Sequence, residues 1–146
     1  MTRAVRAAQV FALATALLAT SAQAFDQKQL DHFLTVKRCP GCDLSNAQMV
    51  DEDLRDAYLP GANLSGANLT VSNLSGANLA GANLDGADLA MGVLTGTILD
   101  GASLRKTNVD DADFNGASMS GADVTGTRMS HTKNTPDLSQ AKGFKP

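Results

Sequence analysis

The sequence contains no tryptophan, and aromatic residues make up only 4% of its 146 residues although 43% are hydrophobic. A core built around large rings is therefore excluded, and any core has to consist of small and aliphatic side chains. Long apolar runs are also scarce, since the only one lies at 10–19. This run is too short to span a bilayer comfortably, so we do not expect an integral membrane protein.

The first 24 residues have the features of a secretory signal peptide. Arg3 and Arg6 form a basic region before the apolar run, and the small-x-small sequence Ala-Gln-Ala at 22–24 follows it. We expect cleavage after Ala24 and an exported protein, either periplasmic or secreted, and an uncleaved N-terminal anchor is the alternative. No cysteine follows the cleavage site directly, so a lipid anchor is not indicated.

Basic residues are few after this segment. Without Arg3 and Arg6 the chain has 10 Lys and Arg against 15 Asp and Glu, a formal net charge of −5. This charge argues against nucleic acid as a direct ligand. The sequence also has no Lys/Arg stripe, which weakens binding to anionic lipid surfaces.

Apolar residues recur every five positions from Leu44 to Met129, in 18 units without a gap. A small residue stands two positions before each of them in 17 units, and only Glu52 breaks this rule. Glycine stands two positions after them in ten units. The predicted inward core consists of Leu44, Met49, Leu54, Leu59, Leu64, Leu69, Leu74, Leu79, Leu84, Leu89, Leu94, Leu99, Leu104, Val109, Phe114, Met119, Val124 and Met129.

A period of five fits neither a helix nor a straight strand. A helix would turn successive apolar positions by about 140° and spread them around all faces. In a strand, an odd spacing would send consecutive leucines to opposite sides. The chain therefore has to bend once per unit, with glycine and small polar residues at the corner. Repeated bends produce a coil, and the period alone allows three or four units per turn.

The sequences Gly-Ala-Asn-Leu-Ser at 61–65, Gly-Ala-Asn-Leu-Thr at 66–70 and Gly-Ala-Asn-Leu-Asp at 81–85 resemble the pentapeptide-repeat family. The resemblance covers residues 42–131. It implies an all-β solenoid, a right-handed quadrilateral β-helix with four units per coil. It also implies a function to weigh, because the best-known cytoplasmic members resemble a DNA duplex and bind topoisomerases.

The two ends of a solenoid need covers, because they expose apolar side chains and unpaired backbone. In the segment 26–37, Leu30, Phe33 and Leu34 form one apolar helix face, which predicts a capping helix. We therefore divide the chain into a signal peptide at 1–24, a capping helix and connector at 25–41, the solenoid at 42–131, and a C-terminal cap or tail at 132–146.

Some units depart from the pattern, and there we expect the coil to be looser. Val71 and Met91 stand where glycine is usual, and the stretch 106–111 has no corner glycine. Glu52 occupies an inward position. We expect Glu52 either to point outward through a local distortion or to lie near the open first coil.

The only residues with a pattern suited to chemistry are Cys39 and Cys42, in the sequence Cys-Pro-Gly-Cys. In an exported protein a structural disulfide is the default prediction, and thiol-disulfide exchange is the alternative. Exchange usually needs a βαβ context, which the sequence does not show. No second cysteine pair completes a zinc site, and Asp43 stands where covalent haem attachment needs histidine. His32 and His131 are lone histidines, for which a surface position is the default.

We therefore expect no catalytic residues, no metal and no cofactor. The favoured function is a structural or protein-interaction module with an unknown protein partner. The alternatives are a redox protein that uses Cys39 and Cys42, and a DNA mimic that binds topoisomerase, which export disfavours. An exposed end coil also leaves a homodimer open.

Overall fold

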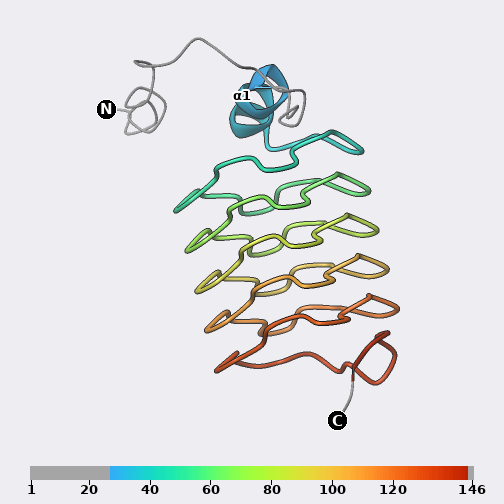
Figure 1. Cartoon of the computed structure of the whole chain (residues 1–146). Helices are drawn as coiled ribbons and strands as arrows, with labels where there is room; N and C mark the ends of the chain where they lie inside the picture. The colour runs from blue at the N-terminus through green and yellow to red at the C-terminus, as the bar shows by residue number, and fades with distance from the viewer. Residues whose placement is uncertain (1–26, 145–146) are drawn as a thin grey trace, which may run out of the picture.

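The computed structural model describes residues 27–144, where the chain forms a stack of flat coils with one helix at the end of the stack (Figure 1). Helix α1 covers Gln27–Val36 and is the only helix in this range. The predicted signal peptide at 1–24 lies outside the described residues. No described helix has the length and apolar character needed to cross a membrane.

Helix α1 lies above the first coil (Figure 1). Leu30 and Phe33 are buried, and Leu34 packs against the same core. The helix ends where Lys37 takes a φ of 52°, with its N–H donating to the Phe33 carbonyl oxygen at 2.6 Å. A residue in this left-handed conformation commonly ends a helix. The helix lies within 26–37, where the sequence predicts it.

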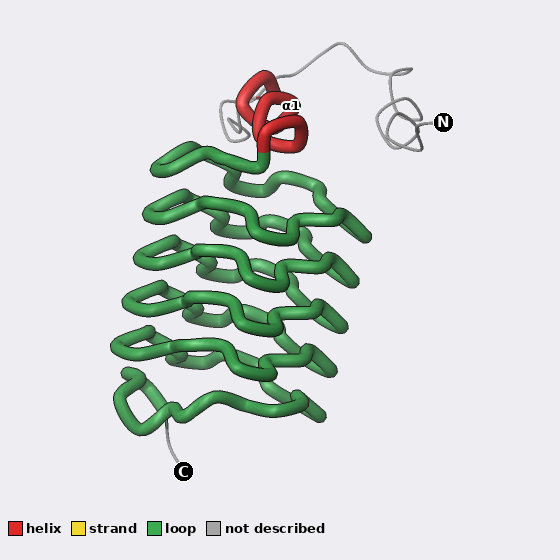
Figure 2. Tube along the Cα trace, turned by 180° about the vertical axis from the view of Figure 1, so that it is seen from behind, coloured by secondary structure: helices red, strands yellow, loops and turns green. Residues whose placement is uncertain are grey.

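The coils repeat every 20 residues. Parallel bridges join each residue that precedes a large inward residue to its counterpart one coil later, from Arg38 with Tyr58 to Asp113 with Lys133. A repeat of 20 holds four units of five, so each coil has four sides and the three-sided alternative is wrong. The sides are short, and Figure 2 draws them as loops. Isolated bridges join them from coil to coil.

Each corner is a tight turn that begins at the large inward residue. The Leu84 carbonyl oxygen accepts the N–H of Ala87 at 3.0 Å, and Gly86 between them has a φ of 66°. Glycine takes a positive φ without steric penalty, whereas a side chain crowds the backbone there. The corner therefore explains the glycine that recurs two positions after the large residue.

Backbone groups between the corners bond to the next coil or to a neighbouring side chain. The Leu84 N–H donates to the Ser103 carbonyl oxygen at 2.7 Å. The Asp85 N–H donates instead to the Asn83 side-chain oxygen at 3.0 Å. The same side-chain contact recurs in 11 units. The side chain of the asparagine or aspartate before the large residue thus accepts a backbone N–H that has no carbonyl partner in the next coil.

The interior is a column of the predicted inward residues. Of these 18 residues, 17 are at most 4% exposed, and Met129 at the C-terminal end is partly buried against the same core. The small inward residues lie between the large ones, and most are alanines with at most 1% exposure. Alternation of large and small side chains therefore fills the coil, and Phe114 is the one aromatic ring among these inward residues.

Four hydroxyl-bearing residues occupy small inward positions, and the coil before each of them satisfies its hydroxyl. The Thr97 hydroxyl donates to the Leu74 carbonyl oxygen at 2.8 Å. The hydroxyls of three further residues likewise donate to the carbonyl oxygen 23 positions earlier in the sequence, namely those of Ser72, Thr107 and Thr127. A buried hydroxyl without a partner would cost about 1 to 3 kcal/mol, so this contact is what makes serine and threonine tolerable inside.

The coil keeps its register where the repeat departs from its pattern. Val71, Met91, Lys106 and Asp111 take the corner conformation with φ of 57–64°. Their N–H groups still bond to the next coil at 2.8–3.0 Å. The looseness expected at these positions is therefore absent. Glu52 is half-buried in the first coil, which is one of the two expected placements.

The ladder of bridges begins at Arg38, earlier than the predicted boundary at 42. Cys39 stands five positions before Leu44 and so takes the phase of a large inward residue. Gly41 takes the phase of a corner, with a φ of 67°. One more unit therefore belongs to the coil than the sequence analysis assigned.

The C-terminal segment folds back onto the last coil. Leu138 is buried there, and Lys142 forms a bridge with Asp123. Gly143 lies so close to Thr125 that a Cβ at this position would come within 2.7 Å of the Thr125 Cα. This segment covers the core as expected, although Phe144 remains 44% exposed.

Candidate functional site

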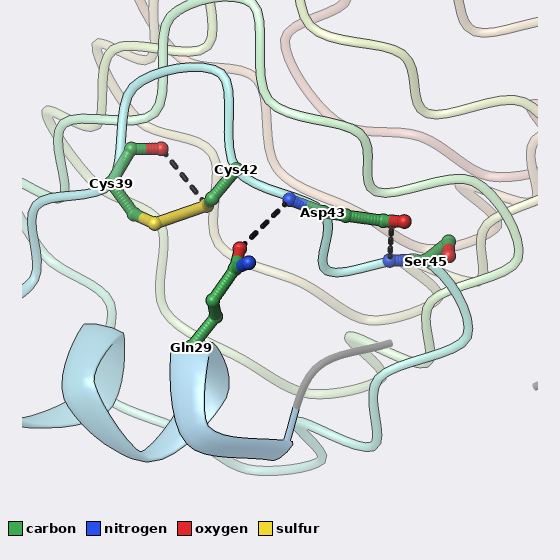
Figure 3. The surroundings of a disulfide bond; sticks show 5 residues. All are labelled: Gln29, Cys39, Cys42, Asp43 and Ser45. Atoms are coloured by element: carbon green, nitrogen blue, oxygen red, sulfur yellow. Dashed lines mark hydrogen bonds between the residues drawn. A yellow bond between two sulfur atoms is a disulfide. The ribbon is translucent and has the colours of Figure 1, made fainter. Parts of the chain in front are cut away.

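The two cysteines lie where α1 passes into the first coil (Figure 3). Cys39 and Cys42 are joined as a disulfide in the structure, with their Cα atoms 5.5 Å apart. The Cys42 N–H donates to the Cys39 carbonyl oxygen at 3.4 Å across Gly41, which has a φ of 67°. The pair therefore bridges a corner turn of the same kind that the repeat uses throughout.

The surroundings of the pair favour a structural role. The Asp43 N–H, next to Cys42, donates to the Gln29 side-chain oxygen of α1 at 3.2 Å (Figure 3). Arg38 lies over the Tyr58 ring, with its guanidinium carbon 4.3 Å from the ring centre. A reactive cysteine pair usually starts a helix, whose N-terminus favours the thiolate. Here the pair follows the C-terminal end of α1 instead.

The part of the chain that the structure describes holds no group of three or more His, Cys, Asp and Glu side chains suited to a metal ion. His32 is exposed on α1, and His131 is exposed at a corner near the other end of the stack. An open depression of the surface lies between Asp85 and Arg105. Recognition on such a surface depends on what the outward side chains present.

The corners of successive coils stack into four edges along the rod. One edge, here called the glycine edge, consists of Gly41, Gly61, Gly81, Gly101 and Gly121. The diagonally opposite edge, here called the side-chain edge, consists of Asp51, Val71, Met91, Asp111 and His131. All five of its residues have φ of 56–64°. A side chain in this conformation costs roughly 1–2 kcal/mol, and a β-branched one such as Val71 costs most.

Exposed apolar side chains gather on the side-chain edge. Val71 and Met91 are 45% and 53% exposed, and Val50 and Val93 beside the corners are 48% and 36% exposed. The Val71 N–H donates to the carbonyl oxygen of Ala90, the residue before Met91, at 3.0 Å. Val71 and Met91 therefore lie in adjoining coils. We call Val50, Val71, Met91 and Val93 the apolar patch.

Carboxylates lie at both ends of the apolar patch. On the edge, Asp51 lies one coil before Val71 and Asp111 lies one coil after Met91, and neither aspartate forms an ion pair within 27–144. Asp53, on the adjoining side, forms ion pairs with Lys37 and Arg55, which balance its negative charge. Hydrogen bonds from Arg55, together with the charge of Lys37, hold the pKa of the Asp53 carboxyl well below its usual range. Asp51 and Asp111 therefore place free negative charge on the edge itself.

The predicted residues and this edge occupy different places. The predicted inward residues are in the interior, and Cys39 and Cys42 are at the junction of helix and coil. The side-chain edge was not among the predicted sites. The signal that identifies it is the absence of glycine at corner positions spaced by 20, and that spacing has to be known first.

Comparisons with known proteins agree with this geometry. The sequence matches the family of pentapeptide repeats in 8 copies, over residues 39–76, 63–101, 72–116 and 97–133. A pentapeptide repeat protein from the cyanobacterium Cyanothece 51142 is 27% identical, with a TM-score of 0.63 over 80% of this chain and 92% of that one. Another from Nostoc Pcc 7120 is 28% identical, with a TM-score of 0.58 over 80% and 93% of the two chains. No curated protein matches the sequence.

Proposed function

Because this chain belongs to the pentapeptide-repeat family, we propose that it is a non-enzymatic structural or protein-interaction module. Proteins of this family fold as right-handed quadrilateral β-helices, and we assign that hand and cross-section to these coils. The observation that carries the proposal is the filled interior, where 17 of the 18 inward residues are at most 4% exposed.

A filled interior leaves function to the outer surface. Leucine and alanine side chains occupy the space in which another fold would hold a substrate. The ladder of hydrogen bonds fixes each outward side chain one coil, about 4.8 Å, from its neighbour. A rigid surface loses little conformational entropy when a partner binds, which suits a protein-interaction role.

We also propose that the protein is exported through its signal peptide, is cleaved after Ala24, and carries Cys39 and Cys42 as a structural disulfide. An oxidising compartment favours this bond, and the pair cross-links the first corner of the coil, directly after α1. The formal net charge of −5 after cleavage disfavours a nucleic acid ligand. Export likewise disfavours a topoisomerase as the partner.

Replacing Cys39 with alanine is expected to lower the free energy of unfolding by about 1 to 2 kcal/mol, because the cross-link restricts the unfolded chain over a short loop. Cys42→Ala places the usual small residue of the repeat and is expected to have a similar effect. The double variant is expected to lose no more than either single variant, since all three remove the same bond. Chemical unfolding without reductant measures these values.

Two outcomes would contradict the structural disulfide. Losses that add up in the double variant would show that each cysteine acts alone. Reduction of insulin by the purified protein, abolished in Cys39→Ala, would support the redox alternative, whereas we expect no turnover.

The interaction role can be tested with a photo-crosslinking amino acid on each side of one coil. Ser65, Thr70, Ser75 and Ala80 are half-exposed and represent the four sides. In cells that express the full chain with its own leader, we expect a discrete protein adduct from one or two of these positions. Adducts at none of the four, together with turnover of any substrate by the purified protein, would contradict the proposal.

A further inference from the structure

The side-chain edge keeps residues in a conformation that glycine adopts more easily. The glycine edge shows that the same coils are built with glycine at every corner of an edge. Val71 and Met91 are about half exposed, so little burial offsets the strain of their positive φ. Strain that the fold does not require is concentrated at functional positions in proteins. The two side chains are therefore better explained by what they contact outside the chain.

The apolar patch lies at the middle of this edge rather than at an end of the rod. Val50, Val71, Met91 and Val93 come from three successive coils. These four residues are the majority of the seven exposed large hydrophobic residues within 27–144. Contiguous apolar side chains on a soluble protein commonly mark a binding surface. Neither α1 nor the C-terminal segment covers this patch, because both lie at the ends of the stack (Figures 1 and 2).

The charges around the patch identify the chemistry of its partner. Asp51 and Asp111 bracket it along the edge without an ion pair in the described part of the chain. We propose that the side-chain edge binds a protein segment that presents apolar side chains between lysine or arginine residues. This inference rests on the proposed role as an interaction module and assigns its binding surface.

The size of the site suits a short segment. Asp51 and Asp111 are three coils apart, which corresponds to roughly 14 Å along the rod. An extended chain covers this distance with about four or five residues. A second copy of this chain is a poorer complement, because it would bring one acidic edge against another.

The proposal can be tested by selecting peptides from a phage-displayed library of random sequences on the purified protein. We expect the enriched peptides to carry apolar residues flanked by lysine or arginine. Their affinity for the double variant Val71→Gly/Met91→Gly is expected to fall by about tenfold or more, as apolar contact area is lost. Their binding to the unaltered protein is expected to weaken as salt screens the aspartates.

The glycine variant separates binding from folding. Because glycine suits both corners, Val71→Gly/Met91→Gly is expected to melt about 4 °C higher or more, even though it binds less. Lys106→Gly is the matched control, since Lys106 has a φ of 57° on a different edge. This control is also expected to gain stability, but it should retain full affinity for the peptides.

The outcomes also distinguish this inference from the proposed function. The crosslinker at Thr70, beside Val71, is expected to give the protein adduct. Adducts only from Ser65 or Ala80, no enrichment of peptides, or equal binding to the double variant would overturn the assignment of the edge and leave the interaction role standing. Enrichment of acidic peptides, or a dimer that the double variant loses, would also overturn it.

Discussion

Replacing Leu84 with alanine is expected to lower the free energy of unfolding by about 3 to 5 kcal/mol. Leu84 is 0% exposed and lies in the middle of the stack, one coil after Leu64 and one coil before Leu104. The main-chain bonds of Leu84 hold its coil against the next one, so the cavity cannot collapse easily. Unfolding by denaturant, followed by circular dichroism, measures the loss.

Met129→Ala is the matched control. Met129 has the same phase as Leu84 but lies at the C-terminal end, where it is only partly buried. The site can collapse and admit water, so we expect a loss of about 1 kcal/mol. An equal loss in the two variants would mean that position in the stack does not determine burial, and the inward column would then be the wrong description of the core.

The core could be predicted from the sequence because side-chain size alone marks the inward phase. Leucine at every fifth position is incompatible with a helix or a straight strand, so the chain had to coil. The partners of the inward hydroxyls could not be predicted in this way. Thr97 donates to a carbonyl oxygen 23 residues earlier, and that distance follows only from four units per coil.

The start of the coil was misplaced for a physical reason. Cys39 is smaller than leucine, and Lys37 stands where a small residue is usual, so the first unit lacks the size pattern of the others. The backbone nevertheless follows the ladder from Arg38 onward. Backbone hydrogen bonds and the corner at Gly41 define this unit, and a search for apolar side chains does not detect them.

The side-chain edge was hidden for a different reason. Non-glycine residues at corners were interpreted as weak points, because a positive φ disfavours side chains. The structure shows that Val71 and Met91 keep the corner geometry with unbroken hydrogen bonds. Their significance appears only when residues 20 apart are compared, because five such corners then fall on one edge.

Replacing Ala77 with aspartate is expected to cost on the order of 4 kcal/mol or more, a large part of the stability of a domain of this size. Ala77 is 0% exposed at a small inward position, between leucines of its own and adjoining coils. A carboxylate there would lose its water without gaining a cation or a donor. Ala80→Asp is the matched control three residues away, because Ala80 points outward and is half-exposed. We expect this control to change the stability by less than about 0.5 kcal/mol.

The pH dependence of the Ala77→Asp variant distinguishes a buried carboxylate from general damage to the fold. Hydrogen bonds from Asn134 and Thr125 lower the pKa values of Asp113 and Asp123 from 3.8, so these groups stabilise the native protein above that pH and the stability falls as acid protonates them. Burial would raise the pKa of the introduced carboxyl group, so its cost is greatest at neutral pH and decreases as the pH falls through that raised value. We therefore expect the difference in unfolding free energy between variant and native protein to shrink from pH 7 to about pH 5. A difference that stays constant over this range would show that the side chain at this position does not face the interior.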